Sequence, residues 1–155
     1  MFNNLLKTAS KEEIIEALSK NINVDSEESF FNQKATKFAE IILSVIIPLR
    51  EQNLLFNPEG RPLDTLNVEE FIKWCDLVSL KTLYFTLKQS NVSNSLLRTK
   101  YQKLEADNYK EIDIKLLTNY VKENAINLDE ELYDFPIRNY NLHMGIGSVI
   151  RNAMK

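Results

Sequence analysis

Residues 38–49 read FAEIILSVIIPL, and only Glu40, Ser44 and Pro48 interrupt the apolar side chains of this run. A helix that is apolar on every side has no face to offer to water, so neighbouring elements must enclose it. The run has twelve positions, fewer than the about 20 apolar residues that a membrane span needs. We therefore expect the segment to be the central helix of a bundle, without membrane contact. Because Pro48 cannot donate to the carbonyl of Ser44, the helix should kink or end there.

The composition indicates helices around this central segment. The chain has 155 residues, of which 44% are hydrophobic, with three glycines and four prolines. A chain of this length is expected to fold as one domain with one core. So few glycines and prolines argue against the many turns of a sandwich or barrel. The sequence thus predicts an all-α fold, a single domain over residues 1–155 with six to eight helices.

Capping residues predict where several helices begin. Ser10 and Glu13 have the spacing of a capping box, in which each side chain bonds to the backbone N–H of the other residue. Asn67 has the side chain of an N-cap. A break is expected near Asp76 to Ser79, because a single helix through this stretch would be apolar nearly all round. The remaining helices are predicted from about Asp25 to Gln52, Leu96 to Ala106, Asp113 to Asn124 (with Leu116, Leu117, Tyr120 and Val121 inward), and Pro136 to Met154, with a possible acidic turn at 129–133.

Two glycines lie inside the last predicted helix. Gly145 and Gly147 each cost a helix about 1 kcal/mol relative to alanine. Close approach of another helix would compensate for that cost.

Residues 53–66, NLLFNPEGRPLDTL, are predicted to form a surface loop. Pro58 suits the second position of a turn and Gly60 a position with positive φ. The apolar residues 54–56 should anchor the loop to the core. Since an ordered loop of this length is uncommon without a function, Phe56 and Arg61 are candidate contact residues.

The charge of the chain is uneven. Its formal net charge is −3, but residues 81–110 carry six basic and two acidic side chains, and residues 111–135 carry seven acidic and two basic ones. One interpretation of the basic group is a partner- or nucleic-acid-binding surface that neutralises phosphates, with an aromatic ring for stacking. The other interpretation is an ordinary solvated helix surface. The candidate residues are Lys88, Arg98, Lys100, Lys103 and Tyr101.

The residue types give little sign of catalytic chemistry. The phosphate-binding pattern GxxxxGK[ST] is absent, and one histidine with one cysteine cannot supply a tetrahedral zinc site. We therefore predict no metal and no cofactor. Cys75 is interpreted as a buried thiol, and His143 either as a structural or surface histidine or as a proton-transfer group. The acidic residues 129–134 are expected to be a solvated face, with a glycosidase pair as the alternative.

The lone cysteine also bears on the compartment. It allows no internal disulfide and fits a reducing environment. The first residues, MFNNLLKTASKEE, lack the basic and apolar regions of a signal peptide. The sequence thus favours the cytoplasm.

The segments NLLKTASKEEIIEAL and ATKFAEIILSVIIPLRE resemble the opening of the all-alpha domain of type IV secretion system coupling proteins, the TraG/TraD-like conjugative ATPases. The matching pieces are Asn4–Leu6, Ser10–Glu13, Phe30–Ala35 and Leu49–Arg50. They cover the first third of the chain, and the later part is similar in helical pattern only.

This resemblance implies that the chain is one domain of a larger motor, in the cytoplasmic part of a protein anchored in the inner membrane. The family's nucleotide-binding motifs lie outside this domain, so the domain itself would not be an enzyme. It would recognise a protein effector, a relaxase–DNA complex or an accessory factor. The net charge of −3 favours a protein partner over DNA alone. The alternatives are a free-standing helical adaptor or chaperone that binds a protein, and a small helical enzyme that uses His143 with a carboxylate.

Overall fold

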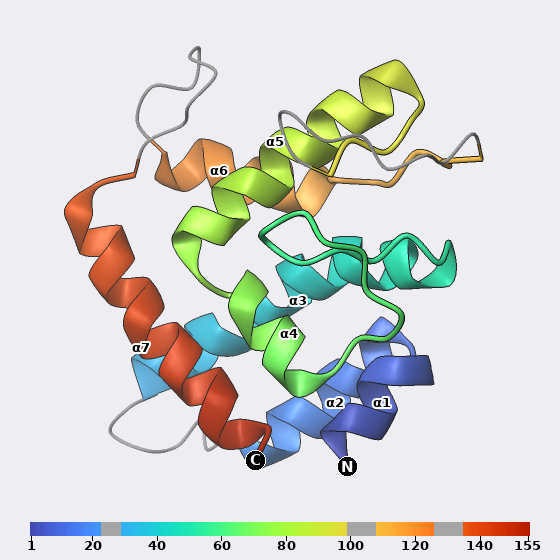
Figure 1. Ribbon diagram of the computed structural model, residues 1–155. Helices are drawn as coiled ribbons and strands as arrows, with labels where there is room; N and C mark the ends of the chain where they lie inside the picture. Colours follow the sequence, from blue (N-terminus) through green and yellow to red (C-terminus); the bar gives the residue numbers. More distant parts are fainter. Residues whose placement is uncertain (23–28, 99–107, 126–134) are drawn as a thin grey trace.

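The computed structural model describes residues 1–22, 29–98, 108–125 and 135–155 (Figure 1). Within these ranges the regular elements are all helices, and an isolated β-bridge links Phe56 and Pro62. This confirms the predicted all-α bundle. The helices of the described ranges are α1 (Phe2–Thr8), α2 (Lys11–Asn21), α3 (Ser29–Glu51), α4 (Val68–Trp74), α5 (Leu77–Ser93), α6 (Lys115–Asn124) and α7 (Ile137–Ala153).

The predicted central segment is the second half of α3, and it is buried as expected. The side chains of Ile42, Val45 and Ile46 are fully enclosed. Helices α2, α6 and α7 pack directly on α3, which runs through the middle of the molecule in Figure 1. Residues from all seven helices contribute to one hydrophobic cluster.

Helix α3 continues past Pro48 for about one more turn and ends at Glu51. Its end is defined by Asn53, which has a positive φ of 58°. The N–H groups of Asn53 and Leu54 donate to the carbonyls of Arg50 (3.0 Å) and Leu49 (2.9 Å). These two bonds form a Schellman motif. The proline therefore stands in the last turn, and the left-handed Asn53 ends the helix.

The predicted N-caps are present, with one difference in detail. The backbone N–H of Glu13 donates to Ser10 Oγ (3.1 Å), and that of Glu70 donates to Asn67 Oδ1 (2.9 Å). The Glu13 carboxylate accepts from the hydroxyl of Ser10 (3.2 Å) and is not seen bonded to the Ser10 N–H. Before this cap lies α1, a two-turn helix that the sequence analysis did not predict.

Several predicted boundaries shift. Cys75 and Asp76 separate α4 from α5, slightly before the predicted break. Residues 96–98 are not helical, so the helix predicted from Leu96 does not begin there. Pro136 precedes the first residue of α7 and does not occupy it. The rest of the helix predicted over 96–106, the start predicted at 25–28 and the acidic turn at 129–133 lie outside the described residues.

The loop between α3 and α4 folds back on itself. Asn57 and Gly60 close a turn in which the Gly60 N–H donates to the Asn57 carbonyl (2.8 Å), and Gly60 has a φ of 83°. The Asn57 side chain accepts from the N–H groups of Glu59 (3.0 Å) and Arg61 (2.9 Å). Phe56 is fully buried, and its carbonyl accepts from Trp74 Nε1 (3.2 Å). Phe56 is thus the loop anchor that the sequence predicts, and its buried side chain offers no surface to a partner in this structure.

Candidate partner-binding cleft

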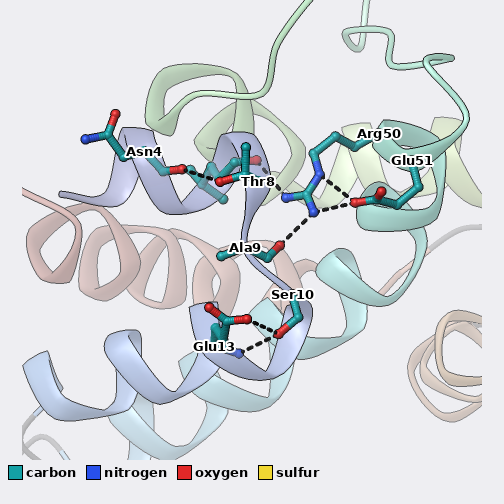
Figure 2. Close-up of polar contacts among 8 residues, drawn as sticks. Asn4, Thr8, Ala9, Ser10, Glu13, Arg50 and Glu51 are labelled. Atoms are coloured by element: carbon teal, nitrogen blue, oxygen red, sulfur yellow. Dashed lines mark hydrogen bonds and ion pairs between the residues drawn. The ribbon is translucent and has the colours of Figure 1, made fainter.

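The corner between α1 and α2 is held by Arg50, which comes from the last turn of α3 (Figure 2). Its guanidinium donates from Nη1 to the carbonyl of Leu6 (2.9 Å) and from Nη2 to the carbonyl of Ala9 (2.6 Å). These carbonyls lie at the end of α1, where a helix has no N–H groups of its own to satisfy them. Arg50 therefore caps α1 and ties the corner to the central helix.

The charge of Arg50 is balanced by its neighbour in the sequence. Glu51 Oε1 accepts from Arg50 Nε (3.1 Å) and Nη2 (2.5 Å). Together with the two carbonyls, this uses four of the five N–H donors of the guanidinium. The Arg50 side chain is only 8% exposed. Arg50 is thus a structural residue, and it presents little charge to a ligand.

A cleft of about 600 Å³ opens between this corner, the second half of α3 and the start of α6. Its apolar lining consists of Leu43, Ile47, Pro48 and Leu116. Leu116 was predicted to point inward, but it is 41% exposed because the inner face of α6 is formed by Leu117 and Val121. The polar lining consists of Thr8, Ser10, Lys11, Glu12, Glu13, Ser44, Arg50, Glu51 and Asp113.

The rim of the cleft is acidic. Lys11, its other basic residue, lies 3.7 Å from the Glu40 carboxylate, which neutralises it from outside the lining. Glu12, Glu13 and Asp113 are exposed, and in the described ranges no cationic side chain is paired with any of them. A second hollow of about 300 Å³ adjoins the cleft and shares Thr8, Arg50 and Glu51 with it.

The candidate basic surface is only partly described. Lys88 is exposed on α5, with its ammonium 5.8 Å from the ring centroid of Tyr84. After α5 the chain turns back, so that Arg98 lies beside this helix. Thr86 Oγ1 on α5 donates to the carbonyl of Arg98 (3.4 Å). Arg98 Nε is enclosed and has no hydrogen-bond partner in the described structure. Lys100, Tyr101 and Lys103 lie outside the described residues. Lys88 and Arg98 thus share one end of α5, but they do not line the cleft.

His143 is buried on the inner side of α7. Its Nε2 is hydrogen-bonded to the hydroxyl of Tyr120, and its ring packs edge-on against Phe38, 4.5 Å between centroids. Burial lowers the pKa of His143 to about 4, although the Cys75 backbone and the Asp76 carboxylate oppose this shift. The imidazole is therefore neutral near pH 7, and its bonded partner is a phenol.

A cavity of about 250 Å³ beside His143 is also lined by Cys75, Asp76 and Arg151. Burial raises the pKa of the Cys75 thiol far above its usual range, so the reactive thiolate is suppressed. No three His, Cys, Asp or Glu side chains of the described ranges are grouped to hold a metal ion.

No pattern in the sequence predicted the cleft. Its acidic rim comes from α2 and from the segment before α6, more than ninety residues apart, so no local pattern joins Glu12 to Asp113. The sequence gives one indication of the corner beside the cleft, which is the cation Arg50 directly after the buried run 38–49. Arg61, the other loop candidate, is exposed but lies outside the cleft lining.

No protein-family model, curated protein or solved structure matches the chain. Among the helices of the described residues, none combines the length and the apolar character that a membrane span requires.

Proposed function

We propose that the chain is a recognition domain that binds a segment of a protein partner in the cleft beside α3 and performs no chemistry itself. The observation that carries this proposal is the cleft, which joins the accessible apolar side chains of Pro48 and Leu116 to an unpaired acidic rim. Hydrophobic surface provides affinity, and charges at the rim provide selectivity. Arg50 holds the corner in place before a partner arrives, which lowers the entropy cost of binding.

We further propose that this domain serves a type IV secretion coupling ATPase. Its partner would then be a protein effector, a relaxase–DNA complex or an accessory factor, met on the cytoplasmic side. Support comes from the segments that resemble this family. Asn4–Leu6, Ser10–Glu13 and Leu49–Arg50 meet at one corner, where Arg50 binds the Leu6 carbonyl beside the Ser10 cap (Figure 2). Three of the four segments that resemble the family thus lie at the corner that borders the cleft, and Phe30–Ala35 lies outside it.

Site-specific photocrosslinking tests this function. In cells that carry the gene, a benzoylphenylalanine replaces Leu116 in the cleft. The matched control carries the same residue at Val92, which is apolar, 82% exposed and outside the cleft lining. We expect position 116 and not position 92 to crosslink to a secreted effector, a relaxase or an accessory factor. Equal labelling at both positions, or labelling of unrelated proteins alone, would contradict the proposal.

The coding region separates the coupling ATPase from the adaptor or chaperone. A reading frame that continues into a Walker-type strand supports the motor, and one that contains only this domain supports the adaptor. The enzyme alternative would use His143 with Asp76, which line the same cavity. A His143→Gln variant that keeps the biological activity of the full protein would exclude it.

Lys88 on α5 and Arg98 beside it have their own test. The reversals Lys88→Glu and Arg98→Glu should weaken single-stranded DNA binding, and should lower its salt dependence, if this group contacts phosphates. DNA binding that is unchanged by both reversals would remove these two residues from the candidate surface.

A further inference from the structure

The charge and shape of the cleft define the partner segment more closely. Resting on the proposed function, we propose that the cleft takes an amphipathic segment of the partner, with lysine or arginine on one face and apolar side chains on the other. A volume of about 600 Å³ holds a few side chains and not a folded domain. A short helix or extended segment is therefore the fitting occupant.

The basic face follows from the charges that remain unmatched. Glu51 balances Arg50 (2.5 Å), and Glu40 balances Lys11 (3.7 Å). The exposed carboxylates of Glu12, Glu13 and Asp113 are left at the rim without a cation in the described ranges. Glu13 accepts from the Ser10 hydroxyl, but this bond leaves its charge in place. An acidic rim attracts basic side chains and repels the phosphates of nucleic acid.

The apolar face follows from the floor of the cleft. Leu43 and Ile47 line it from α3 but are themselves buried, at 0% and 9% exposure, so Pro48 and Leu116 provide the apolar surface that a partner can reach. Leu116 comes from a different helix, in the first turn of α6, and is exposed. Apolar side chains of the partner would cover Leu116 on binding, while its basic side chains reach Glu12 and Asp113.

The test uses synthetic fluorescent helical peptides of about four turns. The first has leucines on one face and lysines on the other. The second has glutamates in place of the lysines, and the third has the lysine peptide's composition in an order that breaks up the apolar face. Binding to the purified chain is measured by fluorescence anisotropy at about 50 and 200 mM salt. We expect only the first peptide to bind, and to bind more weakly at the higher salt.

Matched variants place the binding in the cleft. Glu12→Lys with Asp113→Asn removes rim charge and leaves an acceptor for the Lys115 N–H that Asp113 now binds (2.9 Å). The control, Glu59→Lys with Glu123→Gln, changes the net charge equally at exposed positions outside the cleft. We expect the first variant to bind the lysine peptide about tenfold more weakly and the control to be unchanged. Leu116→Ser should also weaken binding, and Val92→Ser should not.

The outcomes separate this inference from the proposed function. If Leu116→Ser weakens binding while the charge variants do not, or if the glutamate peptide binds equally well, the basic face is refuted and a protein-binding cleft remains. If no peptide binds and position 116 crosslinks to no protein, both fail. A dimer in sedimentation equilibrium that Leu116→Ser dissociates would assign the cleft to a second copy of the chain and overturn the inference.

Discussion

At the scale of single residues, Arg50 decides how the first two helices sit on the third. It is a cation whose side chain is 8% exposed, with two backbone carbonyls and one carboxylate as its partners. In Arg50→Met these carbonyls lose their donor, so we expect the free energy of unfolding to fall by about 2–4 kcal/mol. Urea denaturation measures this change. Arg61→Met, at an exposed position, is the control and should change stability by less than about 0.5 kcal/mol.

His143 makes stability depend on pH. Its pKa is lowered to about 4 in the folded protein and lies near 6.5 in an unfolded chain. Below pH 6.5 the unfolded chain therefore binds a proton that the folded protein excludes. This contribution to stability is complete above about pH 6.5 and is lost as the pH falls towards 4. Between pH 7.5 and 4.5 we expect the wild type to lose about 2 kcal/mol more than His143→Gln does.

A second variant makes this prediction independent of the damage done at position 143. Tyr120→Phe removes the hydrogen-bond partner of Nε2 but keeps the buried imidazole, so the pH dependence should persist. Urea unfolding of all three proteins at both pH values gives the comparison. An identical pH dependence in the wild type and His143→Gln would show that another group is responsible.

At the scale of elements, the two glycines of α7 have different surroundings. A Cβ on Gly145 would lie 2.6 Å from the ring of Phe31 on α3, so close helix packing accounts for this glycine as predicted. A Cβ on Gly147 would meet no described atom within 4 Å. Gly147→Ala should therefore stabilise the protein by about 1 kcal/mol. In Gly145→Ala the Phe31 ring must move, so the gain should be smaller or reversed.

Thermal unfolding followed by circular dichroism measures both glycine variants. If Gly145→Ala stabilises as much as Gly147→Ala, the Phe31 contact does not restrict this position.

At the scale of the whole molecule, all seven described helices contribute to one hydrophobic cluster. A single core predicts one cooperative transition. Far-UV circular dichroism, which reports the helices, and the fluorescence of Trp74, buried beside Phe56, should therefore give coincident curves in urea. Ile46→Ala should shift both curves together and cost about 2–5 kcal/mol. Curves that separate would indicate two units and contradict the predicted single domain.

Predictions that depend on neighbouring residues were the most accurate, such as the Ser10 and Asn67 caps and the positive φ of Gly60. Helix α1 was missed because it has no capping side chain. Leu116 was misplaced because it lies beside the buried Leu117 on α6, where position in the sequence alone does not define the inner face.

The sequence by itself determined the helical class and the identity of the central helix, because both depend on apolar spacing within one segment of the chain. Only the tertiary structure decided where a partner-binding cleft could lie. Arg50 reaches carbonyls more than forty residues away, and the cleft joins Glu12 to Asp113. Such contacts arise from how helices pack on one another, and the local preferences of the chain do not specify them.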